Sequence, residues 1–461
     1  MSAVRQSNTG SDILNGSIVA TLRRMTVPMI FGMITLMSFN LVDTFFISLL
    51  GTEPLAAVSF TFPVTFTVIS LAIGLGIGTS AVIAKALGAN KMEEAKFDGF
   101  VALLVSALMV AILSAAGYAL IEPIFTLLGA GPQTMPYIYD YISIWFAGAV
   151  FLIMPMIGNS ILRASGDTKT PSLIMGLGGL INAILDPLLI FGYGPFPELG
   201  VKGAAIASVI AWSVGVVFIL YLLAIKKRLL QVSSPQQSIV QATSKILKIG
   251  LPAAGANMLT PIAMAVMTAI IATYGAEAVA AFGVGSRIES IASLVVLALS
   301  MTLPPFVSQN FGAQKYQRVE DAYRTTLKFV MAWQFGIYIV LIAASHWISL
   351  AFGDEPQVVD IIKLFIYTLP LSYGLQGVII LTNSSFNALH KPMRALVLSV
   401  VRLFVFYVPC AYLGSHIAGI HGLFIGAAIG NLFTAMLAYK WFMSTLGAMQ
   451  VSQPQSQEKT V

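Results

Sequence analysis

The stretch GGLINAILDPLLI, residues 178–190, places an amide and a carboxylate inside an otherwise apolar run. Asn182 and Asp186 are four residues apart, so on a helix both side chains project from one face. A carboxylate within an apolar membrane helix is costly, and such residues usually serve a function. A second carboxylate, Asp43 in NLVDTFFI, follows Asn40 by three residues. We therefore expect the fold to bring these two polar helix faces together in a hydrated cleft.

The composition indicates a membrane protein with many helical spans. Of the 461 residues, 57% are hydrophobic and only 10% are charged, and the mean hydropathy is +0.87. Repeated apolar runs of roughly 20 residues predict an all-α polytopic fold with twelve transmembrane helices, the eighth over 278–309. The net charge of +6 does not indicate a nucleic-acid partner, because lysine and arginine cluster in short loops between apolar runs. The lone cysteine, Cys410, excludes an intrachain disulfide and disfavours a cysteine-based metal site.

Basic residues fall at alternate ends of the predicted spans, which predicts that both termini are cytosolic. An even number of spans agrees with that orientation. The longest polar stretch between spans, KKRLLQVSSPQQSIVQATSK, divides the chain into two halves of six spans each. The predicted parts are an N-terminal cytosolic segment (1–20), an N-lobe (21–226), a cytosolic linker (227–244), a C-lobe (245–446) and a disordered cytosolic tail (447–461).

The two halves repeat with a constant offset in residue number. Pro28 corresponds to Pro252, and with the same offset the pair Asn159 and Ser160 corresponds to Asn383 and Ser384. Because each half has an even number of spans, both halves enter the membrane in the same direction, and the repeat is parallel. Such a repeat predicts two helix bundles related by a pseudo-twofold axis along the membrane normal, with a cleft suited to alternating access.

Several motifs resemble those of the multidrug and toxic compound extrusion (MATE) family. They are LGANKMEEA at 87–95, LRASGDTKTP at 162–171 and LDPLLI at 185–190. The resemblance covers residues 12–446, and GVGSRIES at 283–290 is similar to the DinF-like branch. It implies two six-helix lobes in a bacterial inner membrane. It also implies export of amphipathic, often cationic compounds in exchange for inward H⁺ or Na⁺, with no other cofactor.

The resemblance implies a cation-coupling site in the N-lobe, with no metal other than a possible Na⁺. The site would comprise Asp43, Asn182 and Asp186, with Asn40 on the same face and Ser208 supplying a hydroxyl. Independently of the family, Asp43 lies 19 residues after Arg24, roughly 28 Å along a helix. Asp186 lies 17 residues after Lys169, roughly 26 Å, so the two carboxylates should reach similar depth. The alternative is two separate acids near the outer surface.

Other residues have a structural and a functional interpretation. Pro28 resembles the bending proline of the family, and it is either a moving hinge or a static kink. Arg287 and Glu289 are two residues apart and do not share a helix face, so each needs a partner elsewhere, and Arg402 is a candidate. These residues form either a buried structural pair or a substrate contact. Gly74, Gly76 and Gly78 favour close helix packing over phosphate binding, because the context of a nucleotide loop is missing.

The leading interpretation is a secondary multidrug antiporter that acts as a monomer in the lipid bilayer and confers antibiotic resistance. A flippase for lipid-linked precursors is the main alternative, but it would favour a more cationic cleft. The sequence has no GxSxG, HExxH or paired-aspartate protease motif, and it has no GxxxxGK[ST] motif for ATP. We therefore do not expect an enzyme. A channel is disfavoured, because two homologous lobes suit rocking better than a fixed pore.

Overall fold

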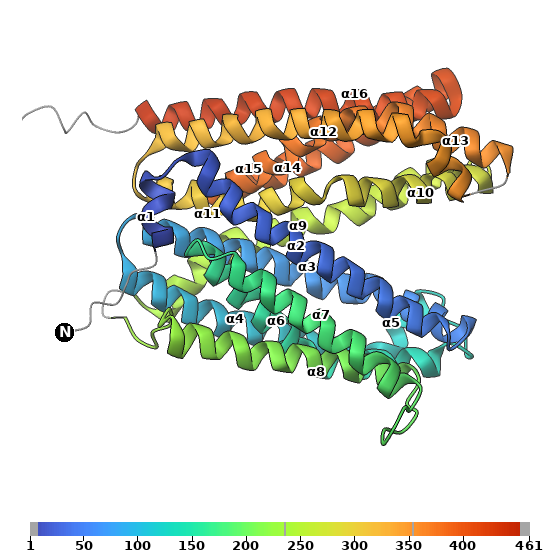
Figure 1. Cartoon of the computed structure of the whole chain (residues 1–461), viewed down its shortest axis with the longest axis horizontal. Helices are drawn as coiled ribbons and strands as arrows, with labels where there is room; N and C mark the ends of the chain where they lie inside the picture. Colours follow the sequence, from blue (N-terminus) through green and yellow to red (C-terminus); the bar gives the residue numbers. More distant parts are fainter. Residues whose placement is uncertain (1–7, 235–236, 353–354, 452–461) are drawn as a thin grey trace, which may run out of the picture. The chain divides into compact units, whose positions relative to one another are not determined.

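The computed structural model describes residues 8–234, 237–352 and 355–451, and Figure 1 shows that long helices dominate the chain. Within these ranges every regular element is helical and no β-strand is present. The predicted all-α fold is confirmed. Predictions for residues 1–7 and 452–461 lie outside the described residues.

The first half of the chain contains eight α-helices and one π-helix. They are α1 (Asn8–Asn15), α2 (Ile18–Ser48), α3 (Thr52–Gly88), α4 (Met92–Ala119), α5 (Ile121–Leu127), α6 (Met135–Ala164), α7 (Lys169–Ile190), α8 (Val201–Leu220) and η1 (Tyr221–Lys226). The second half contains α9 (Ile239–Ala272), α10 (Ala276–Ala292), α11 (Leu294–Gly312), α12 (Tyr316–Phe352), α13 (Pro356–Thr368), the 3₁₀ segment η2 (Leu369–Ser372), α14 (Tyr373–Ala388), α15 (Pro392–Val400), the π-helix η3 (Val401–Tyr407) and α16 (Val408–Val451).

The described residues form 11 helical segments long and apolar enough to cross a membrane. The last of them runs for 60 residues and contains a break at Ala418 and Gly419. Gly419 has φ 59°, a left-handed conformation that glycine adopts without strain. This segment therefore supplies two spans, and the predicted total of twelve agrees with the structure.

The eighth predicted span, 278–309, is not one unbroken helix. It divides at Ser293 into α10 and α11. The buried Gln334 on α12 donates its amide to the Ala292 carbonyl over 3.0 Å, so a carbonyl at the end of α10 has a partner. The predicted tail also needs correction, because α16 continues through residues 447–451.

The helices group into two compact units. Unit 1 includes Arg23–Ala254, and unit 2 comprises Asp12–Leu22 and Gly255–Val461. In unit 1, α6 contacts α3, α4, α7 and α8. In unit 2, α14 contacts α11, α12, α15 and α16, so it has the corresponding central place.

The three glycines of α3 serve close helix packing, as predicted. A Cβ on Gly74 would lie 2.4 Å from the Gly250 carbonyl oxygen, and one on Gly78 would lie 2.6 Å from that of Ile246. A Cβ on Gly76 would lie 2.8 Å from the Ser160 hydroxyl. The backbones of α3 and the beginning of α9 therefore touch, which only glycine permits.

Candidate functional site

The structure brings Asp43 of α2 and Asp186 of α7 together within unit 1. Their carboxyl groups lie within hydrogen-bonding range of one another, and Asp186 is fully buried. One oxygen of each group, Oδ1 of Asp43 and Oδ2 of Asp186, is buried without a hydrogen-bond partner among the described residues. The site therefore holds two adjacent carboxyls with unused acceptor capacity.

Glycines set the distance between the two helices that carry the carboxyls. A Cβ on Gly179 of α7 would lie 2.0 Å from a ring carbon of Phe39 on α2. A Cβ on Gly32 of α2 would meet Ser172 of α7 at 3.0 Å. The helices can approach only because these positions lack side chains, and this contact fixes Asp43 against Asp186.

Asn182 links the carboxyl pair to α8. Its amide nitrogen Nδ2 donates to Asp186 Oδ1 over 3.1 Å and to Ser208 Oγ over 3.4 Å. The four-residue spacing thus places Asn182 and Asp186 on one face, as the sequence predicts. The side chain of Asn40 lies outside the described residues.

Tyr141 of α6 also belongs to this site, although the sequence did not single it out. Its phenol is close enough to Asp43 and Asp186 to interact electrostatically with both. The ring packs beside the buried residues Ile47 and Ile190. In the sequence Tyr141 is one of three alternating tyrosines in YIYDY, and helical periodicity alone does not show which one faces the carboxyls.

The arrangement can bind one positive charge. Two carboxylates repel each other strongly where water is scarce, because the low dielectric strengthens charge interactions. A proton or a monovalent cation between them removes this repulsion. The cluster is thus suited to loading and releasing a cation.

The region around Pro28 is a regular helix. Helix α2 continues through Pro28 without interruption from Ile18 to Ser48. Proline donates no backbone hydrogen bond, so the helix is weakened one turn earlier. This local weakness is compatible with both interpretations of Pro28, the moving hinge and the static kink.

The polar residues of the C-lobe have different surroundings. Glu289 accepts a hydrogen bond from Gln376 Nε2 over 2.7 Å. Arg402 interacts with Glu289 only electrostatically, and its guanidinium lies 6.0 Å from the Tyr407 ring on the same π-helix η3. Arg287 is exposed and has no ion-pair partner among the described residues. Glu289 is therefore satisfied by an amide, whereas Arg287 is left unpaired.

Comparison with known proteins identifies the family of this chain. The MatE family model matches residues 28–188 and 252–413. The two matched segments begin at Pro28 and Pro252, the pair of prolines that the internal repeat relates. The match covers most of the chain and both of its halves.

Individual relatives cover nearly the whole length. The chain is 43% identical to the FAD transporter of Shewanella oneidensis over 93% of this chain and 95% of the relative. It is 26% identical to the probable multidrug resistance protein YpnP of Bacillus subtilis, over 94% and 96%. The solved structure of the Vibrio cholerae MATE transporter VcmN in the bent form superposes with a TM-score of 0.90 at 35% identity, over 96% and 99%. From the repeat, the fold and these matches, the chain belongs to the MATE family of membrane transporters, which are not enzymes.

Proposed function

We propose that this transporter is a secondary active exporter that couples inward cation flow to the outward movement of amphipathic small molecules. The observation that supports the proposal is the buried contact between Asp43 and Asp186, extended by Asn182 and Ser208. Loading a cation there changes the net charge of a site formed by α2, α7 and α8. Antiport requires that cargo and cation disfavour one another, a reciprocal coupling typically of about 1–3 kcal/mol.

The donor arrangement favours H⁺ over Na⁺ as the coupling ion. Asn182 turns its amide NH₂ group toward Asp186 and Ser208. A Na⁺ ligand would instead present an oxygen. Two carboxyls within hydrogen-bonding range share a single proton readily.

Reconstituted transport separates the two ions. The purified protein in proteoliposomes should move cargo when a pH gradient is imposed, and a Na⁺ gradient alone should have little effect. Asp43→Asn and Asp186→Asn should each abolish the gradient dependence while leaving a folded protein. Asp140→Asn is a matched control, because Asp140 is partly exposed and its carboxylate pairs with Lys202 over 3.1 Å.

Two results would contradict this assignment. Full gradient dependence in Asp43→Asn would place the coupling residue elsewhere, with Glu289 as the next residue to test. Transport driven by Na⁺ but not by H⁺ would retain the site and overturn the proton assignment.

A second cargo class is supported by a specific observation, the unpaired Arg287. An arginine within a membrane span is unfavourable toward lipid and normally faces a hydrated cavity. The exposed residues of α10 are mostly small or polar, with one large apolar residue among them: Ala276, Ala280, Gly283, Arg287, Ser290 and Ile291. A free guanidinium on such a face suits an anionic group. Since the relative from Shewanella is named an FAD transporter, we propose flavin dinucleotide as a cargo alongside cationic drugs.

Export assays distinguish the two cargo classes. Everted membrane vesicles energised with a pH gradient should accumulate FAD, and Arg287→Gln should lower that uptake roughly tenfold, the effect of losing one charge-assisted hydrogen bond. Arg324→Gln is the control, because Arg324 pairs with Glu320 one turn away on α12. Uptake of a cationic dye with no uptake of FAD would favour the multidrug interpretation alone.

The orientation of the chain in the membrane is part of the proposal. Single cysteines at Gly51, Gly131 and Gly275 should react with an impermeant maleimide from outside the cell. Cysteines at Lys91 and Ser234 should react only from the cytosolic side. The reverse pattern would contradict cytosolic termini.

A further inference from the structure

The segment that leads into the first span of each half is held by the unit that contains the other half. Asp12–Leu22 precedes and begins α2, yet it belongs to unit 2. Residues 239–254 begin α9, the first span of the second half, yet they belong to unit 1. Each first span therefore begins in one unit and continues in the other.

We call Asp12–Leu22 the lead-in of the first half. It is hydrogen-bonded to the rest of unit 2 through the carboxyl end of α1. Asn310 Nδ2 donates to the Ile13 carbonyl over 3.2 Å, and Arg318 Nε donates to the same carbonyl over 3.2 Å. Arg318 also donates to the Gly16 carbonyl. The Ile13 carbonyl is free because an α-helix leaves its last four carbonyls without internal partners, and Gly16 follows directly after α1. A cation at this end also complements the helix dipole.

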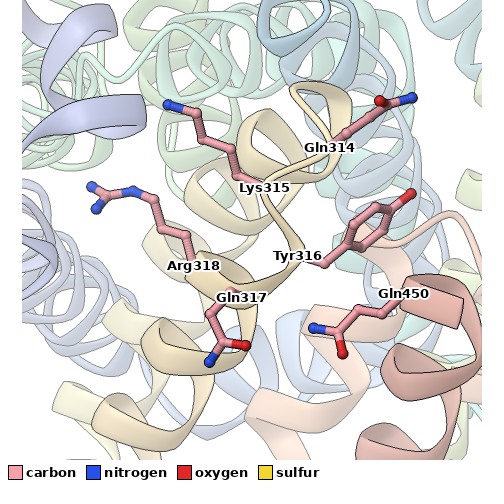
Figure 2. A pocket seen from close by; sticks show the side chains of 6 residues that line it. All are labelled: Gln314, Lys315, Tyr316, Gln317, Arg318 and Gln450. Carbon is pink, nitrogen blue, oxygen red and sulfur yellow. The ribbon is translucent and has the colours of Figure 1, made fainter. Parts of the chain in front are cut away.

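Lys315 adds to this contact from the turn between α11 and α12. Its Nζ donates to the Leu14 carbonyl over 3.0 Å and to Asn15 Oδ1 over 2.8 Å. Figure 2 shows Lys315 and Arg318 projecting to one side of this turn, away from Tyr316. We call the contact of Lys315, Arg318 and Asn310 with the end of α1 the first latch.

The lead-in of the second half comprises the residues just before α9 and the first turns of α9. It is bonded to the turn between α3 and α4 and to the beginning of α4. Gln237 Nε2 donates to the buried Asp98 Oδ1 over 2.6 Å. Lys245 donates to Gln237 Oε1 over 2.9 Å and pairs with Glu94. Lys91 pairs with the same carboxylate over 3.3 Å. We call this network the second latch.

The two latches occupy equivalent places in the repeat. The offset that relates Pro28 to Pro252 also takes Ile13 to Gln237, Lys91 to Lys315 and Glu94 to Arg318. The bonding groups differ, because basic side chains bind backbone carbonyls in the first latch and acidic side chains bind an amide and an ammonium in the second. The same contact is thus made twice with different chemistry.

The lead-ins are anchored by packing as well as by polar contacts. Ile13 and Leu22 are buried in unit 2. Ala242, Ile246 and Ile249 belong to the buried core of unit 1. Helix α2 is continuous from Ile18 onward, and a helix keeps a fixed rise per residue instead of stretching. The part of α2 that lies in unit 1 therefore cannot shift along the helix axis unless the first turns of the helix leave their site in unit 2.

We propose that the two latches hold the beginnings of the first spans in place and must release together before cargo can enter from the cytosol. The proposal rests on the cation-coupled export proposed above. Water reaches both latches, since open cavities of about 440 Å³ and 610 Å³ border them, lined in part by Lys315 and Arg318 and by Lys91 and Lys245. The bonds made by the lysines and by Arg318 can therefore exchange for bonds to water. Asn310 and Asp98 are fully buried, so breaking their bonds costs free energy and opposes release.

Hydrogen exchange of the full chain in lipid nanodiscs tests joint release without requiring transport. Arg318→Ala removes the bonds to the Ile13 and Gly16 carbonyls, and amides in 12–22 should exchange roughly tenfold faster. Because release is joint, amides in 239–249 should accelerate by a similar factor. Arg324→Ala, on the same helix but outside the latch, should change neither segment. Acceleration confined to 12–22 would overturn the proposal.

Cross-linking tests whether release is required for transport. In a Cys410→Ser background, Asn15→Cys with Lys315→Cys is joined by a short cleavable bis-maleimide. Transport should fall at least tenfold and return after cleavage, whereas a Glu320→Cys and Arg324→Cys pair within α12 should tolerate the reagent. Transport that persists through the closed cross-link would show that the latches are permanent pivots and would refute the idea. A wild-type protein that moves no cargo but shows the linked exchange would refute the export function and keep the latches.

Discussion

Replacing Gly74 by alanine should destabilise the protein through a backbone clash. The new Cβ would lie 2.4 Å from the Gly250 carbonyl oxygen, 2.5 Å from the Ala254 nitrogen and 2.6 Å from the Ala254 Cβ. None of these atoms is the end of a flexible side chain, so α3 and α9 must move apart. Overpacking of this kind costs typically 1–3 kcal/mol, and the rigid neighbours put Gly74→Ala at about 3 kcal/mol.

Two further glycines calibrate the size of this effect. A Cβ on Gly76 meets the Ser160 hydroxyl at 2.8 Å, which can rotate away, so Gly76→Ala should cost about 1 kcal/mol. A Cβ on Gly178 of α7 meets nothing within 4 Å, so Gly178→Ala should be neutral or stabilising by up to about 1 kcal/mol from helix propensity. Equilibrium unfolding in mixed micelles measures the series. Equal midpoints for Gly74→Ala and Gly178→Ala would refute the close packing.

Three other perturbations have expected outcomes. Burial alone would raise the pKa of Asp167, but hydrogen bonds from Lys227 and Thr170 hold this pKa below its usual range. The pair is partly exposed, so Lys227→Ala should cost about 1 kcal/mol at pH 7. This loss should shrink as the pH falls through the lowered pKa, because the carboxyl is then protonated in the folded and unfolded protein alike. A cost that stays flat as the unfolding midpoint is followed from pH 7 to pH 3 would contradict this. Tyr141→Phe should leave the fold intact and weaken the pH dependence of cargo affinity by about 1 kcal/mol, roughly fivefold. Curves of cargo affinity against pH that match the wild type would exclude Tyr141 from the site. Pro28→Ala should slow transport in proteoliposomes while cation dependence is retained, and loss of that dependence would show that Pro28 positions the site instead of bending the helix.

The sequence alone determined the fold class and predicted that the two carboxyls lie at similar depth. Hydropathy and helical spacing are local properties, so they predicted the spans and put Asn182 and Asp186 on one face. The internal repeat adds long-range information, because two halves of like sequence fold alike. The match of depth between Asp43 and Asp186 follows from the constant rise of a helix, and it needed no knowledge of packing.

Local patterns failed where an element depends on a distant partner. The break at Ser293 has its freed carbonyl bonded by Gln334, which lies 42 residues away from Ala292. Glu289 interacts electrostatically with Arg402, but its hydrogen bond comes from Gln376 on another helix, which the sequence did not single out. Neither partner differs in its local sequence from many other polar residues in the chain.

The tertiary structure decided how these helices meet. Only packing shows that Tyr141 faces the carboxyls, that Gly74 and Gly78 touch the beginning of α9, and that α1 ends on Arg318. Each of these contacts joins residues far apart in the sequence, and its energy depends on distance and burial, not on local periodicity. A helical pattern of apolar residues shows which face of a helix is apolar. Several neighbouring helices could cover that face, and only the complete set of packed side chains decides which of them does.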